Sequence, residues 1–215
     1  SLLSSLTTVA SRCMSASVVH ASLLNLDELD DQYKEEIGDC LRDVVSIVPI
    51  DHVLHDFTEG LKAEIEMSSK VQDGWKTVRA RLVILLALAK SFKNDDAGAH
   101  RPLFISLVDV LCILFSAGED VGVPHIILES TAWVLAGLAS SFACLSDAQI
   151  ARVANVLIER LRHYEALIAR GACVAMMKLC EHAADRLAST DVPARLAAIH
   201  ATGGPTASRN LRLGQ

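Results

Sequence analysis

The chain has 215 residues, of which 51% are hydrophobic and only 4% aromatic, and its formal net charge is −6. This length supports a sizeable buried core, and the acidic balance argues against nucleic-acid binding over the whole surface. A membrane-spanning helix is not expected either, because the best uncharged stretch, Ser130 to Leu145, has sixteen residues where about 20 apolar ones are needed.

The charge is unevenly distributed along the chain. Residues 1–150 contain 11 Lys and Arg against 21 Asp and Glu, whereas residues 151–215 contain 9 against 5. The most acidic stretch lies between Asp27 and Asp43. The basic C-terminal part therefore suits an acidic partner, although a solvated helix face explains the same pattern.

Apolar periodicity predicts helices along the whole chain, and caps mark several of their ends. Pro49 ends one helix, and Asp51 and Asp73 are placed to cap the next two. Pro102 fits a first helical turn, and Ser146 with Gln149 three residues later forms a capping box. The predicted helices are 2–22, 28–48, 52–69, 74–92, 102–116, 124–142, 147–162, 165–188 and 192–200.

Three of these helices repeat the same order of small and large apolar residues. When Leu88, Leu138 and Leu179 are superposed, the offsets between the segments are 50 and 41 residues. Recurrence at such a period is typical of stacked helical repeats. The other equivalent positions are Val78/Leu128/Ala169, Leu82/Ala132/Cys173, Leu85/Leu135/Met176 and Ala89/Ala139/Cys180.

Each recurring helix follows a more amphipathic one, which predicts antiparallel helix pairs with the recurring helices in an inner layer. We therefore expect an all-α fold: an α-solenoid of about four repeats that forms a single domain over residues 1–200. Its pairs are 2–48, 52–92, 102–142 and 147–188, followed by a capping helix 192–200 and a C-terminal tail 201–215.

The pairs resemble HEAT or armadillo-type repeats, whose second helix commonly begins with an apolar residue followed by Arg. Over residues 50–188 the resemblance implies a right-handed all-α solenoid that binds proteins and performs no chemistry. Two recurring helices match that beginning and one departs from it: Val78-Arg79 and Ala169-Arg170 match, and Leu128-Glu129 departs.

Two turns carry the residue types that most often anchor protein interfaces. Trp75 and Lys76 lie at one turn between paired helices, and Arg162, His163 and Tyr164 lie at another. Because stacked repeats place equivalent turns along one edge, we expect these five residues to form an aromatic and basic ridge that binds a partner. In the alternative interpretation, Trp75 packs against its own helix pair and the adjacent repeat.

The same turn resembles the tubulin-binding edge of TOG domains, which are HEAT-repeat arrays. There a Trp and a Lys occupy the turn, as Trp75 and Lys76 do here. The acidic, glycine-rich turn 117–122 interrupts a continuous basic edge.

Residues suited to catalysis or metal binding are sparse. His52 and His55 are three residues apart but have no defined third ligand, whereas structural zinc sites use four. Cys180 and His182 are two residues apart, about 200° around a helix, and cannot face each other. Asp109 lies on a polar helical stripe, so we expect it to face solvent. We therefore expect neither an enzyme nor a bound cofactor.

The leading functional expectation is a non-enzymatic scaffold that binds another protein. Its alternatives are a tubulin- or microtubule-binding module and a regulatory helical segment of a larger enzyme. Six cysteines without a Cys-x-x-Cys pair indicate a reducing, cytoplasmic environment. Ser1 at the start indicates an excised fragment. The tail, with Arg209, Leu211 and Arg212, is expected to contact the repeat surface or a neighbouring chain.

Overall fold

The computed structural model describes residues 50–68, 70, 74–89, 100–117 and 122–202. Every regular element in these ranges is helical, which confirms the all-α prediction for them. The predicted pair 2–48, the cap Asp73 and the tail from residue 203 lie outside the described residues. The helices are α3 (Ile50–Ser68), α4 (Trp75–Ala89), α6 (Arg101–Ala117), α7 (His125–Leu138), the 3₁₀ helix η2 (Ala139–Cys144), α8 (Asp147–Arg160), α9 (Ala166–Ala188) and α10 (Val192–Thr202).

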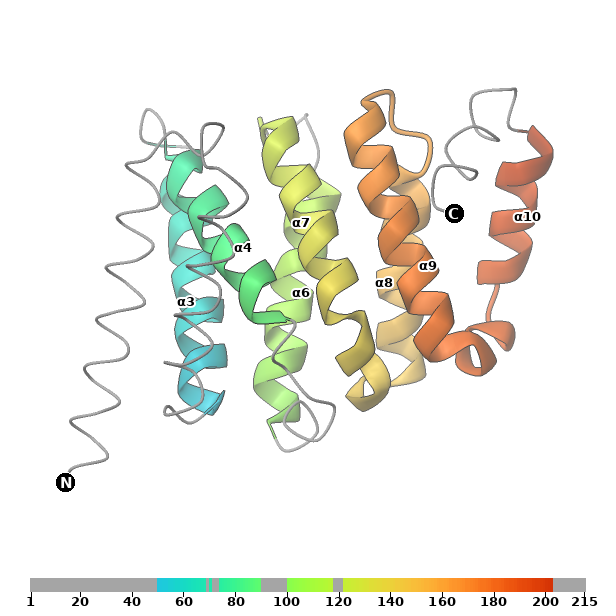
Figure 1. Ribbon diagram of the computed structural model, residues 1–215, viewed down its shortest axis with the longest axis horizontal. Helices are drawn as coiled ribbons and strands as arrows, with labels where there is room; N and C mark the ends of the chain where they lie inside the picture. Colours follow the sequence, from blue (N-terminus) through green and yellow to red (C-terminus); the bar gives the residue numbers. More distant parts are fainter. Residues whose placement is uncertain (1–49, 69, 71–73, 90–99, 118–121, 203–215) are drawn as a thin grey trace.

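The helices stand in two layers (Figure 1). We call α4, α7 and α9 the inner layer and α3, α6 and α8 the outer layer. Neighbours contact one another within each layer, and each inner helix also contacts the outer helix that precedes it in the chain. The last helix, α10, contacts both α8 and α9. The apolar side chains enclosed by the two layers form one continuous core.

Two glycines set the spacing of the inner layer. A Cβ built on Gly171 of α9 would lie 2.9 Å from the Cβ of Ala132 on α7, closer than real Cβ atoms approach. A Cβ on Gly137 of α7 would lie 3.1 Å from the Cβ of Ala89 on α4. The inner helices therefore touch almost backbone to backbone, and this contact excludes larger side chains at the crossing points.

A largely buried ion pair joins the two helices of the first described pair. The guanidinium of Arg81 on α4 donates two hydrogen bonds to the carboxylate of Glu64 on α3, at 2.8 and 2.6 Å. The same guanidinium lies 5.6 Å from the ring centroid of Phe57 and rests on Gly60, where a Cβ would fall 2.4 Å from its central carbon. Such a bidentate geometry fixes both side chains.

Two further arginines satisfy backbone carbonyls that helix ends leave unpaired. Arg160 of α8 donates to the carbonyl oxygens of Phe115 and Ser116, both at 3.0 Å, in the last turn of α6. Arg186 of α9 donates to the carbonyl oxygen of Leu145 at 2.5 Å and to the carboxylate of Asp147 at 2.6 Å. These bonds attach the ends of α6 and the turn before α8 to neighbouring helices.

The predicted capping box is confirmed. The hydroxyl of Ser146 accepts a hydrogen bond from the backbone N–H of Gln149, and the Gln149 side chain accepts one from the Ser146 N–H at 2.8 Å. Asp51, predicted to precede its helix as a cap, instead lies inside the first turn of α3.

The sixth predicted helix does not continue as an α-helix to residue 142. α7 ends at Leu138, and the chain tightens into η2 before Leu145 becomes extended ahead of the Ser146 cap. Tightening of this kind satisfies carbonyls at a helix end. Within α9, Ala183 leaves helical geometry at φ −139° and ψ 23°, so a kink divides the helix that was predicted to be continuous.

Among the described residues, the stretch His125–Cys144 is long and apolar enough to cross a membrane by length and composition alone. It begins before the sequence candidate Ser130 to Leu145 and has 20 residues. Just over half of its apolar window is buried inside the structure, as in the core helix of any folded protein. One such helix among the described residues is weak evidence for or against a membrane span.

Replacing Gly171 by leucine is expected to destabilise the fold, because the new side chain forces α7 and α9 apart. Overpacking of this kind costs about 1–3 kcal/mol, even though leucine favours the helix over glycine by roughly 0.8 kcal/mol. The free energy of unfolding, measured by urea denaturation, should fall accordingly. Ala184→Leu, on an exposed position of the same helix, is the control and should change little. Equal stability of both variants would contradict the close crossing.

Removing the charge of Glu64 is expected to weaken the contact between α3 and α4. Glu64→Gln loses a charge-assisted bidentate bond to Arg81, and both side chains are largely buried. We expect a loss of about 1.5–3 kcal/mol in the free energy of unfolding. Glu59→Gln removes a carboxylate from the exposed Lys62 pair on the same helix and should have no measurable effect. A Glu64 variant that matches this control would show that the ion pair contributes little.

Candidate functional site

Three aromatic side chains from two different turns meet at one edge of the molecule. We call His125, His163 and Tyr164 the turn cluster. The rings of His163 and Tyr164 stack with centroids 4.7 Å apart, and both lie edge-on to the ring of His125, at 5.8 and 5.5 Å. His125 begins α7, whereas His163 and Tyr164 precede α9. The cluster therefore bridges the first residues of two neighbouring inner helices.

Hydrogen bonds fix the orientation of the cluster. The Tyr164 hydroxyl lies 2.8 Å from Nε2 of His125. Nδ1 of His163 accepts a hydrogen bond from the backbone N–H of Glu165 at 3.1 Å, which assigns the proton of the neutral ring to Nε2. The Glu165 carboxylate lies 3.8 Å from Nδ1 of His125 and forms an ion pair with it only when the imidazole is protonated.

Although hydrogen bonds fix its side chains, the cluster presents apolar surface to solvent. Tyr164 is 71% exposed, and Leu167, three residues along the chain, is 50% exposed. Large hydrophobic side chains held in fixed positions at the surface are typical of interaction sites.

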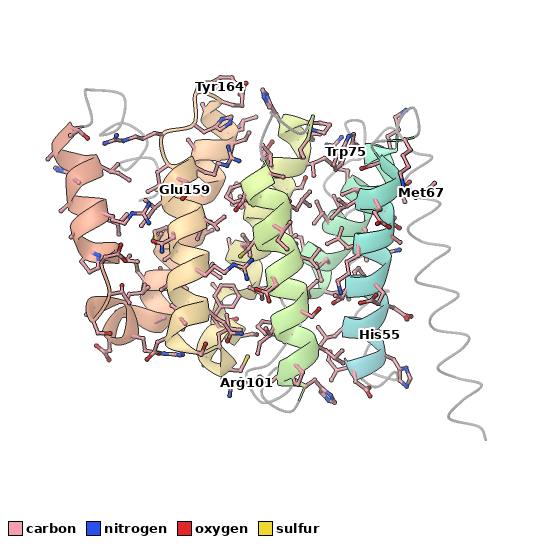
Figure 2. The ribbon with its side chains drawn as sticks, turned by 180° about the vertical axis from the view of Figure 1, so that it is seen from behind. His55, Met67, Trp75, Arg101, Glu159 and Tyr164 are labelled. Atoms are coloured by element: carbon pink, nitrogen blue, oxygen red, sulfur yellow. The ribbon has the colours of Figure 1, made fainter. Side chains whose placement is uncertain are left out.

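Trp75 lies at the same end of the molecule as Tyr164 (Figure 2), and Lys76 is the next residue of α4. Trp75 is only partly exposed and packs against the core, as in the alternative interpretation. Lys76 is exposed. Trp75 and Tyr164 thus share one end of the molecule, but Trp75 packs against the core whereas Tyr164 is exposed.

Arg162 turns away from the other ridge residues towards α10. Its guanidinium donates a hydrogen bond to the hydroxyl of Thr202. It also lines a shallow cleft of about 380 Å³ between α8 and α10. The other residues lining this cleft are Ile158, Glu159, Arg195, Ala198, Ile199 and Thr202. The structure therefore brings His163 and Tyr164 together and places Arg162 on a different surface.

Sequence reasoning missed His125 and Leu167. The superposed helices contained a signal for His125, because it follows Trp75 by the same offset of 50 residues that separates Leu88 from Leu138. It is therefore the equivalent of Trp75 in the next pair. No sequence signal distinguished Leu167 from the apolar residues of the core.

The order Tyr164, His125, Glu165 is similar to a relay of nucleophile, base and carboxylate, but its last link is longer than in such a relay. The separation of 3.8 Å between Glu165 and His125 exceeds hydrogen-bonding distance. Tyr164 is also 71% exposed, whereas catalytic groups usually work in enclosed sites where electrostatic interactions are strong.

The other candidate residues also occupy separate or exposed positions. His52 and His55 are exposed on α3, and no group of metal-ligating side chains occurs among the described residues. Asp109 is 38% exposed, as expected for its stripe, and accepts a hydrogen bond from Arg152 at 2.6 Å. Cys180 is half-buried and His182 exposed, on different sides of α9.

Comparison of the chain with protein-family models, with curated proteins and with solved structures finds no match.

Cysteine reactivity is expected to differ sharply along the chain. Burial raises the pKa of the Cys112 thiol to about 12, so at pH 8 roughly one molecule in 10⁴ carries the reactive thiolate. Burial also raises the pKa of Cys173 and Cys180, which are only half-buried. Iodoacetamide treatment of the native protein, read by peptide mass mapping, should therefore modify Cys173 and Cys180 well before Cys112. Early modification of Cys112 would contradict its burial in α6.

Proposed function

We propose that this chain is a non-enzymatic scaffold, an α-solenoid of HEAT or armadillo type, that binds another protein through the edge carrying the turn cluster. The exposure of Tyr164 is the observation that carries the proposal. Its ring is oriented by His125 and His163 before any partner arrives. A large side chain that is already ordered loses little conformational entropy on binding, which favours affinity.

The neighbouring surface supports the same role. Leu167 extends the apolar area beside Tyr164, and the imidazoles of His125 and His163 supply polar edges around it. A central apolar anchor with a polar surround is the usual arrangement of a protein-binding hot spot.

Regular contacts between successive outer helices, and between α8 and α10, support the solenoid. Lys62 of α3 donates to Ser106 of α6, Arg152 of α8 to Asp109 of α6, and Arg195 of α10 to Asn155 of α8. The partners are 44, 43 and 40 residues apart. These separations lie near the 41-residue offset of the apolar repeat and below its 50-residue offset. A regular separation of this size is expected when each repeat contacts the next.

The double variant Tyr164→Ala, Leu167→Ser tests the proposal. Proteins captured from cell extract by the intact chain are identified, purified and titrated against each variant. We expect the dissociation constant to rise at least roughly 30-fold, the effect of losing a hot spot of about 2 kcal/mol. The melting temperature should not change, because both side chains are exposed.

Ile113→Ser is the matched control, because Ile113 is 60% exposed on α6, outside the turn cluster. It should leave binding intact. A partner that binds the double variant as tightly as the native chain would refute the role of this edge. Purified tubulin is a separate arm at low salt, where contacts from the exposed Lys76 are least screened. Its failure to bind would remove the tubulin alternative alone.

A further inference from the structure

α9 is the last inner helix among the described residues. Its face away from α7 carries positions equivalent to those at which α4 and α7 each contact the next inner helix. Ala89 of α4 meets Gly137 of the next inner helix, and Ala132 of α7 meets Gly171 of the next. In the superposed sequences the equivalents on α9 are Cys180 for Ala89 and Cys173 for Ala132. Both cysteines thus stand where an inner helix contacts its successor.

On α9 these positions are only partly covered by the described residues, although Cys180 packs in part against the core. Cys173 and Cys180 are half-buried, Met177 is 37% exposed and Ala184 is exposed. The spacing of four and three residues places Cys173, Met177 and Cys180 on one helical face, whereas Ala184 follows the kink at Ala183. Gly171, which contacts α7, is about 200° around the helix from Cys173 and so points to the opposite side.

Two helices, α9 and α10, border the space beside this face in the same way as two helices adjoin α7 and two adjoin α9 itself. α7 fits against both α4 and α6, and α9 fits against both α7 and α8. α10 contacts α8 and α9, so α9 and α10 together form a third corner of the same kind (Figure 1). α10 buries only Val192 fully, whereas Leu196 is partly buried and Ala197 exposed.

We propose that the corner between α9 and α10 binds an α-helix of another protein, apolar on its contacting face and with glycine or alanine where it crosses Cys173 or Cys180. The two filled corners define this occupant. In one of them the entering helix places a glycine against Ala89, the equivalent of Cys180, and in the other it places a glycine against Ala132, the equivalent of Cys173. The three face residues, Cys173, Met177 and Cys180, carry no ionisable group that is charged in its buried form, which favours an uncharged partner face. This surface is separate from the turn cluster and does not depend on it.

A synthetic peptide of residues 165–189 is the probe, since this helix fills the equivalent corner between α7 and α8. Its own cysteines are changed to alanine, so that only the protein's thiols are measured. In the intact chain, alkylation of Cys173 and Cys180 by iodoacetamide is followed by mass mapping. At about ten times its dissociation constant the peptide should slow both reactions roughly tenfold. Faster alkylation would mean that the peptide displaces α9, and would overturn the proposal.

Two matched changes make the test specific. A peptide carrying Gly171→Leu should protect neither thiol, because leucine prevents the close crossing. The protein variant Met177→Lys should also abolish protection, whereas His182→Lys, at an exposed position on another side of α9, should not. Protection that survives either the peptide change or Met177→Lys would overturn the proposal, as would no protection at the solubility limit.

Two further measurements test whether residues 203–215 occupy the corner and whether the corner binds independently of the turn cluster. If both thiols are unreactive in the intact chain and become reactive when residues 203–215 are deleted, the tail covers the corner and the partner-helix proposal fails. The variant Tyr164→Ala, Leu167→Ser should leave peptide protection unchanged. Thiol protection by the peptide tests the corner alone, and partner binding by the turn-cluster variant tests the turn cluster alone. Failure of one proposal is therefore distinguishable from failure of the other.

Discussion

The close approach of the inner helices is the contact on which the other features of the structure depend. At Gly137 and Gly171 a helix backbone lies against an alanine methyl group of the preceding helix. Dispersion contacts are short-ranged, so one added methylene at such a crossing moves whole helices rather than one side chain. The low aromatic content of the chain follows from this constraint, because small and aliphatic residues allow α4, α7 and α9 to pack side by side.

The outer layer is held by different forces. Its helices are linked to one another by polar side chains, such as Arg152 with Asp109, and by Arg160, which donates to carbonyls at the end of α6. Long side chains adjust to small changes in helix spacing, whereas glycine-to-alanine crossings do not. The inner layer therefore sets the geometry, and the outer layer follows it while keeping one side in solvent.

The sequence predicted the parts of this structure that depend on periodicity and caps. The helices and the Ser146 capping box follow from local patterns, and the recurring Ala89 and Ala132 positions identified the inner layer. The 3₁₀ ending of α7 and the kink at Ala183 were not predictable, because both depend on how the chain meets its neighbours in space. For the site, the sequence selected Tyr164 by its residue type. Residue type alone does not predict whether such a side chain is exposed or, like Trp75, packs against the core.

The turn cluster is itself a consequence of the inner crossing. His125 begins α7 and Tyr164 precedes α9, 39 residues later, yet the Tyr164 hydroxyl reaches Nε2 of His125. Their rings meet because Gly171 lets the first turns of α9 lie against α7. A larger side chain at that position would separate the two helix starts and dissolve the cluster even if every cluster residue were kept. The buried glycine thus determines whether the exposed tyrosine keeps its contact with His125.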